Sequence, residues 1–254
     1  MATYQLRPMS VGEILDGSLA LLRRNAALFF SLSVACLGVP TVIELYTEFG
    51  GTSGPLSGLS LLGNLLRAIG YLLLSGASVY AVSELYLGRT PRVGEALRFA
   101  TPKMGRLFVS GFAGTIVIFF AALLLVIPGI IVACGYAVAV QAVVLEDLPS
   151  GTEALARSWS LTKGFKGKAF VLGCVMIALF LLVFAGAAFV VGITAAVYKP
   201  LFLPGLILFM VVILMFYPFS SCVLTLFYYD LRVRREAFDL ELLNRHLGTV
   251  PGPV

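Results

Sequence analysis

Side chains suited to catalysis are few in this 254-residue chain, and their spacing matches none of the common catalytic motifs. His246 is the only histidine and lies in a polar segment near the end of the sequence, so a Ser-His-Asp or Cys-His arrangement would depend on it alone. There is no G-x-S-x-G, no phosphate-binding G-x-x-x-x-G-K-[ST] and no H-E-x-x-H. The four cysteines have neither a disulfide nor a zinc spacing. We therefore predict no catalytic residue, no metal and no cofactor.

The charged residues are better candidates for ionic contacts, because nearly all of them fall in short polar segments. Ten residues of these segments are candidates for interaction or structural roles: Glu13, Asp16, Arg23, Arg24, Glu95, Glu153, Arg157, Trp159, Asp230 and Arg232. Anionic lipid headgroups or a partner protein are the ligands that such side chains suit. The aromatic and basic interleaving of a nucleic-acid reader is absent, so we predict no nucleic-acid partner.

Composition places these segments around a membrane domain. The chain is 59% hydrophobic and 12% charged, and its mean hydropathy is +0.99. Its apolar runs are 17 to 30 residues long, a range that includes the roughly 20 residues of a membrane-spanning helix. Outer-membrane strands would be shorter and would alternate apolar with polar residues. We predict an all-α protein with six spans: Ala26–Tyr46, Leu61–Leu87, Leu107–Ile127, Gly129–Leu145, Ala169–Tyr198 and Phe202–Tyr229.

The domain organisation and orientation follow from these spans. We predict one integral membrane domain over residues 1–254, made of an amphipathic helix (1–25), a six-helix bundle (26–229) and a tail (230–254). Every Lys and Arg except Arg67 and Lys199 falls on the side of the termini. The positive-inside rule then places both termini in the cytoplasm, as in a multi-pass protein of the bacterial plasma membrane. The first apolar run is too long for a cleaved signal.

Only three charged residues fall inside the spans. Arg67 lies near the outer end of the second span, where it can reach the headgroups or meet Glu44, and Glu84 lies near the cytoplasmic end. None lies near the middle of a span, where ion-coupled transporters place their ionisable groups. This distribution argues against coupled transport.

A short motif occurs three times, each time before an odd-numbered span. Residues 10–16 (SVGEILD) recur as residues 92–98 (RVGEALR) and more distantly as residues 150–156 (SGTEALA). The S-x-x-E spacing of the first and third copies is typical of a capping box, which predicts that helices begin there. After Ser10, the apolar residues Val11, Ile14, Leu15, Leu19 and Leu22 share one face, as expected of an interfacial helix. Two arrangements would explain the motif. One is three parallel repeats, each an amphipathic helix followed by a transmembrane hairpin; the other is three unrelated interfacial helices.

Small residues in the fifth span suggest close helix packing. Gly186, Ala188 and Gly192 would let another helix approach. The Ala188-x-x-x-Gly192 pair suits either a contact within the chain, which is the commoner case, or a homo-oligomer face.

Several segments together resemble one family. They are residues 6–16 with 23–25, then 127–130, 143–146, 153–155 with 158–159, and finally 228–232. In this order they are similar to the bacterial glycerophosphoryl diester phosphodiesterase membrane-domain family, which includes the YciC-like integral membrane proteins. The resemblance implies a membrane domain that in some proteins is joined to a catalytic barrel. The metal-binding acids and paired histidines of that barrel have no counterpart here. Relatives often have an Arg-Trp pair where this chain has Gly135-Tyr136, and a proline where it has Gln141. We therefore expect no phosphodiesterase activity.

Two functions remain open at this point. The first is a non-catalytic scaffold or accessory subunit whose cytoplasmic helices engage lipids or a membrane-protein partner. The second is a passive permease or lipid-moving protein with a cavity among the six helices, for which Gln141, Tyr136 and Glu84 are the candidate lining residues. Membrane-embedded hydrolysis is a distant third.

Overall fold

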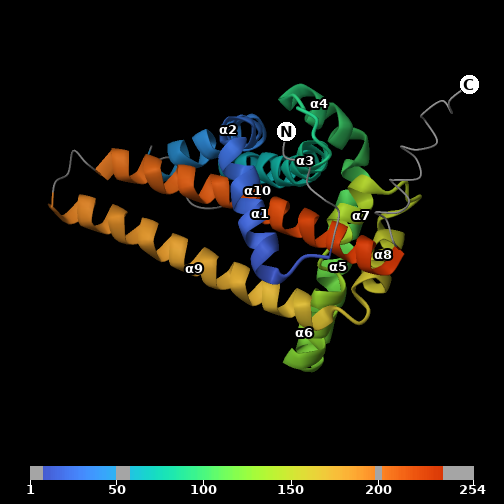
Figure 1. Cartoon of the computed structure of the whole chain (residues 1–254). Helices are drawn as coiled ribbons and strands as arrows, with labels where there is room; N and C mark the ends of the chain where they lie inside the picture. The colour runs from blue at the N-terminus through green and yellow to red at the C-terminus, as the bar shows by residue number, and fades with distance from the viewer. Residues whose placement is uncertain (1–7, 50–57, 198–201, 237–254) are drawn as a thin grey trace, which may run out of the picture.

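The computed structural model describes residues 8–49, 58–197 and 202–236, and within these ranges the ordered elements are all helices (Figure 1). Six of them are long and apolar enough to cross a membrane, which confirms the predicted all-α architecture with six spans. The six candidate spans are Ala26–Thr47, Gly58–Tyr86, Val93–Leu124, Val126–Leu145, Lys166–Thr194 and Pro204–Glu236. His246, Lys199 and the tail beyond Glu236 lie outside the described residues.

The elements follow one another with short connections. In chain order they are α1 (Val11–Arg24), α2 (Ala26–Phe49), α3 (Gly58–Tyr86), α4 (Val93–Ala100), a 3-10 turn (Thr101–Lys103), α5 (Met104–Leu124), α6 (Val126–Gly135), α7 (Ala139–Leu145), α8 (Gly151–Thr162), α9 (Lys166–Val197) and α10 (Phe202–Glu236).

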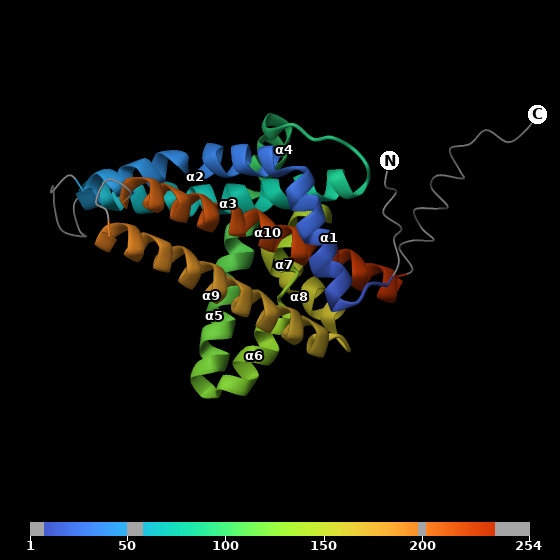
Figure 2. The ribbon, with the colours of Figure 1, turned by 60° about the vertical axis from the view of Figure 1, so that its left-hand side comes forward.

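Helices begin at all three copies of the motif, including the first and third, for which the S-x-x-E spacing predicted a start. Ser10 caps α1 with a complete capping box, in which Glu13 N donates to Ser10 Oγ (3.3 Å) and Ser10 N donates to Glu13 Oε2 (2.7 Å). Arg92 N donates to the Glu95 carboxylate before α4 (3.0 Å), and Glu153 N donates to Ser150 Oγ at the start of α8 (3.3 Å). The α5–α6 hairpin extends in a different direction from the α2–α3 and α9–α10 hairpins (Figures 1 and 2). A threefold structural repeat therefore stays a prediction.

The two ends of the described chain meet at one end of the bundle. Met9 N donates to Asp230 Oδ1 (2.7 Å), which ties the segment before α1 to the C-terminal part of α10. We call this the basic end; it carries α1, α4, α8, the start of α9 and the end of α10. The loop side of the α2–α3 and α9–α10 hairpins is called the opposite end.

α1 packs across α10 as well as presenting a polar face. Ile14 and Ser18 are fully buried, and an added Cβ on Gly17 would lie 3.4 Å from Leu226 of α10. Leu19, which the sequence placed on the buried face, is 47% exposed. The other apolar residues predicted to share this face are buried or partly buried, and Ser18 is accommodated on the packed side by donating to the Ile14 carbonyl (2.6 Å).

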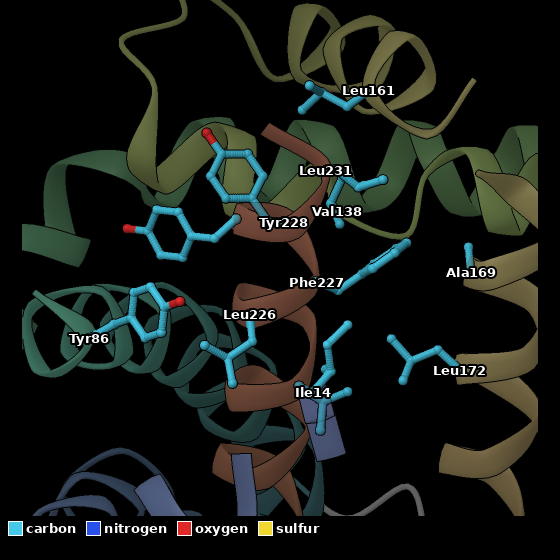
Figure 3. Packing of buried hydrophobic residues seen from close by; sticks show 12 residues of the cluster. Ile14, Tyr86, Val138, Leu161, Ala169, Leu172, Leu226, Phe227, Tyr228 and Leu231 are labelled. Carbon is cyan, nitrogen blue, oxygen red and sulfur yellow. The ribbon is translucent and has the colours of Figure 1, made fainter. Parts of the chain in front are cut away.

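The C-terminal half of α10 is the centre of the core. Figure 3 shows Leu226, Phe227, Tyr228 and Leu231 pointing in different directions from α10 toward side chains of the surrounding helices. These partners include Ile14 of α1, Tyr86 of α3, Leu161 of α8 and Leu172 of α9. The helix continues to Glu236, so the predicted boundary between bundle and tail at residue 230 falls inside a packed helix.

The fourth span is broken between α6 and α7. The sequence predicted one continuous helix, but residues 136–138 form a turn. α8 supplies the missing hydrogen bonds: Ser158 Oγ (2.9 Å) and Thr162 Oγ1 (3.1 Å) both donate to the Gly135 carbonyl, and Ser158 Oγ accepts from Val138 N (3.2 Å). Satisfied backbone groups make such a break tolerable within a membrane domain.

Candidate functional site

Asp230 is the most buried charged side chain at the basic end. Its side chain is 0% exposed, and it accepts hydrogen bonds from Lys168 Nζ (2.5 Å) and Arg234 Nε (3.0 Å) in addition to Met9 N. Lys168 Nζ also donates to the Met9 carbonyl (2.5 Å). One carboxylate therefore joins the segment before α1, the start of α9 and α10.

A second ionic network joins α7, α8 and α10. Arg157 of α8 donates to the Glu146 carboxylate (2.7 and 3.0 Å) and contacts Glu236 of α10 (2.5 Å). Glu146 also accepts from the Tyr228 hydroxyl (2.7 Å), and Glu236 from Arg232 Nε (2.9 Å). Burial disfavours the charge on Arg157, but its hydrogen bonds to the Glu146 and Glu236 carboxylates and their negative charge outweigh burial and raise its pKa. Arg157 is therefore a charged structural bridge.

Replacing Arg157 with methionine should lower the free energy of unfolding by about 2 kcal/mol, because two partly buried carboxylates would lose their shared partner. Thermal unfolding in detergent measures this through a thiol-reactive dye, since Cys36 and Cys222 are buried and become reactive on unfolding. Arg98→Met, at an exposed position on α4, is the matched control and should shift the midpoint little. Equal shifts for both variants would show that the bridge adds no stability.

The structure separates the predicted site residues into three groups. Arg157, Asp230 and Arg232 take part in the two networks. Glu13, Glu95 and Glu153 lie in the first turns of α1, α4 and α8. Asp16, Arg23 and Arg24 are exposed on α1.

Trp159 lies where the broken fourth span meets α8. An added Cβ on Gly135 would lie 2.2 Å from the Trp159 ring, so only glycine allows this contact. Lys166 Nζ sits 3.2 Å from the centre of the same ring, in a cation–π arrangement. The indole is 37% exposed. Trp159 and Lys166 thus pair an aromatic surface with a cation at the basic end.

An apolar groove of about 590 Å³ lies between α6, α9 and α10. Cys134, Ala137, Phe170, Ile177 and Phe227 are among its lining residues. Phe170 and Ile177 are 47% and 62% exposed, so the groove opens toward the lipid-facing surface. Cys134 and Ala137 lie within two residues of Gly135, on which Trp159 packs, so Trp159 and Lys166 lie close to one end of the groove.

The candidate lining and packing residues lie elsewhere. Gln141 is 1% exposed in the core and Glu84 pairs with Arg89 (3.2 Å); neither they nor Tyr136 line the groove between α6, α9 and α10. Ala188 and Gly192 are exposed, and an added Cβ on Gly186 or Gly192 would meet nothing within 4 Å.

The sequence did not single out Lys168, Glu146 or Glu236 as partners within the networks. Each of the three has a partner far away in the sequence: Lys168 and Asp230 are 62 positions apart, Glu146 and Tyr228 are 82 apart, and Glu236 and Arg157 are 79 apart. Met9 and Asp230 are separated by 221 positions. An acid at the predicted exit of the last span, followed by three arginines, was the only signal for Asp230.

Comparison with protein-family models, curated proteins and solved structures finds no match to this chain. Among residues 8–49, 58–197 and 202–236, no three His, Cys, Asp or Glu side chains come together in a way that would hold a metal ion. In the described part of the basic end, the notable polar groups are therefore ion pairs and exposed basic side chains.

Proposed function

We propose that this chain is a non-catalytic scaffold or accessory subunit of a bacterial plasma membrane, with its basic end in the cytoplasm. Anionic lipid headgroups bind to the basic end and hold α1, α4 and α8 at the membrane surface. These short helices are then available to a membrane-protein partner. The resemblance to the glycerophosphoryl diester phosphodiesterase membrane-domain family is consistent with this role but carries no activity over.

The observation that carries the proposal is the division of charge at the basic end. Asp230 and Glu146 are buried or partly buried, and together with Glu236 they pair with basic side chains of other helices, whereas Asp16 and Glu153 stay exposed. Arg23, Arg24, Arg98 and Lys163 are exposed. Each basic side chain close to an anionic membrane surface contributes about 1 kcal/mol of attraction. The result is an end of the bundle that keeps basic side chains exposed after its buried acids are neutralised.

The groove between α6, α9 and α10 supports the same role. An acyl chain in the groove would place its phosphate near Lys166 and its glycerol region near Trp159. Lysine and tryptophan are the side chains that commonly anchor membrane proteins at the headgroup level. This arrangement favours a retained anionic lipid over a water-filled passage.

Removing the exposed arginines should weaken the selection of anionic lipid. The variant Arg23→Gln/Arg24→Gln/Arg98→Gln is expected to lose up to about fivefold per side chain in bound phosphatidylglycerol relative to phosphatidylcholine, the equivalent of about 1 kcal/mol each. The measurement equilibrates the purified chain with mixed detergent–lipid micelles and quantifies retained lipid by mass spectrometry.

The matched control is Asp16→Asn/Glu153→Gln, which removes exposed acids from the same end and should leave or increase phosphatidylglycerol retention. A monodisperse wild-type monomer that carries neither anionic lipid nor a co-purifying protein would overturn the proposal. If the triple-arginine variant and the wild type retain phosphatidylglycerol equally, the exposed arginines do not select anionic lipid.

A further inference from the structure

A second polar feature lies near the opposite end of the bundle, inside two membrane-spanning helices. Arg67 of α3 donates to the Glu44 carboxylate of α2 (2.7 Å), and a second guanidinium nitrogen contacts the other carboxylate oxygen. The pairing confirms one of the two arrangements expected from the sequence. The side chains are 27% and 39% exposed, so each still presents part of its surface. Charges within a membrane are costly, and those that persist commonly mark a binding site.

Two cavities meet at this ion pair. The smaller one, of about 140 Å³, is lined by polar side chains that include Glu44, Thr47, Ser60, Asn64 and Arg67. The larger one, of about 860 Å³, also includes Glu44 and Arg67 in its lining but is otherwise mainly apolar.

The larger cavity is a groove between α2, α3 and α10. Its α2 side extends from Phe30 to Tyr46, which is about 24 Å along the axis of an α-helix. Val42 and Ile207, on its two edges, are 66% and 56% exposed. The groove is therefore open sideways to the lipid, and its length suits an extended hydrocarbon chain lying along the helices.

A small polar compartment joined to a long apolar groove is complementary to an amphiphile. The two charges at the junction are of opposite sign, so a zwitterionic headgroup matches them better than an anionic one, whose excess negative charge Glu44 would repel. A guanidinium binds a phosphate through paired N–H donors. A carboxylate accepts hydrogen bonds from an ammonium, and the hydroxyls of Thr47 and Ser60 and the amide oxygen of Asn64 are further acceptors.

We propose that this site binds a phospholipid with a zwitterionic headgroup that carries a primary ammonium. Arg67 binds the phosphate, Glu44 accepts from the ammonium, and one acyl chain lies in the groove between α2 and α10. The small polar cavity suits a compact headgroup with N–H donors, whereas a trimethylammonium group has no proton to donate to Glu44. The lipid belongs to the leaflet opposite the basic end, so this site is independent of the proposed scaffold role.

Gly38 offers a way to fill the groove without disturbing the helix pair. It lines the groove, and its added Cβ would meet only Val34 of its own helix, at an ordinary 3.5 Å. Gly38→Phe therefore places a ring in the space for the acyl chain. Gly111 of α5 is exposed with nothing within 4 Å of an added Cβ, so Gly111→Phe is the matched control.

The test compares phosphatidylethanolamine with phosphatidylcholine of identical acyl chains, using native mass spectrometry of the full chain in mild detergent. The wild type should retain phosphatidylethanolamine about tenfold better. Glu44→Gln should reduce this preference to near unity, because the amide has lost the charge that pairs with the ammonium. Gly38→Phe should reduce retention of both lipids several-fold, and Gly111→Phe should behave as the wild type.

Equal retention of the two lipids by the wild type would overturn the proposal, as would an unchanged preference in Glu44→Gln. Unchanged retention in Gly38→Phe would overturn the acyl-chain position. Thermal unfolding with the thiol-reactive dye verifies that Glu44→Gln and Gly38→Phe are folded. The variant Arg23→Gln/Arg24→Gln/Arg98→Gln should keep the full preference for phosphatidylethanolamine, which separates this site from the basic end.

Discussion

Replacing Asp230 with asparagine is expected to lower the free energy of unfolding by about 3–5 kcal/mol, the usual cost of removing one partner from a buried ion pair. The Asp230 side chain is 0% exposed, and the change leaves Lys168, whose side chain is only 15% exposed, without its carboxylate. It also weakens the hydrogen bond from Met9 N that holds the segment before α1. The effect should therefore be a general loss of stability together with release of α1.

The thermal midpoint in detergent measures the first effect, and the sensitivity of the chain to proteolysis between residues 8 and 25 measures the second. Asp16→Asn is the matched control, since Asp16 is exposed on α1 and its substitution should change neither quantity appreciably. The double variant Asp230→Leu/Lys168→Met should recover part of the loss, because both buried charges are gone. If Asp230→Asn unfolds at the same temperature as Asp16→Asn, the carboxylate does not secure the basic end.

Gly70→Ala is expected to destabilise the chain by about 1–3 kcal/mol, although it adds only one methyl group. An added Cβ would lie 2.4 Å from the carbonyl oxygen of Cys36 and 3.0 Å from a methyl group of Leu37. The nearest atom belongs to the backbone of α2, so no side-chain rotation relieves the contact and α2 must move away from α3. Packing along the whole α2–α3 hairpin would then be weakened.

Gly192→Ala is expected to change the stability in the opposite direction. Gly192 is exposed on α9 with nothing within 4 Å of an added Cβ, so alanine there should stabilise by up to about 1 kcal/mol through its lower unfolded-state entropy. Thermal unfolding of the two variants under identical detergent conditions measures the contrast. A neutral or stabilising Gly70→Ala would mean that α2 and α3 are not in close backbone contact.

The sequence predicted the six spans and the helix starts after Ser10 and Ser150 because the signals for both are local. A run of apolar residues identifies a span by its length alone, and Ser10 with Glu13 places a capping box within four residues. Hydropathy did not reveal the break after Gly135, because the side chains on both sides of the turn are apolar. The hydrogen bonds that make the break possible come from Ser158 and Thr162, in a different helix.

The sequence did not predict the contacts of the basic end for the same reason, because the partners lie in different helices. Arg232 and Asp230 look like the ordinary polar exit of a last span, yet α10 continues to Glu236, where Lys168 of α9 pairs with Asp230 and Arg157 of α8 pairs with Glu236. Small residues were also ambiguous. Gly186, Ala188 and Gly192 have the spacing of a packing face, but the close backbone contact is at Gly70.

The hydrogen bond from Met9 to Asp230 also sets an order of assembly. Ribosomes release the chain from its N-terminus, so α1 emerges first and α10 last, although each is a main packing partner of the other. Until α10 is inserted, Ile14 has no core to enter and the main chain at Met9 has no acceptor. α1 can therefore dock against α10 only after the rest of the bundle has been synthesised, and this docking is the last packing step. In a chain truncated before Asp230, α1 would lack this docking site, and its apolar face would stay exposed for cellular quality control to recognise.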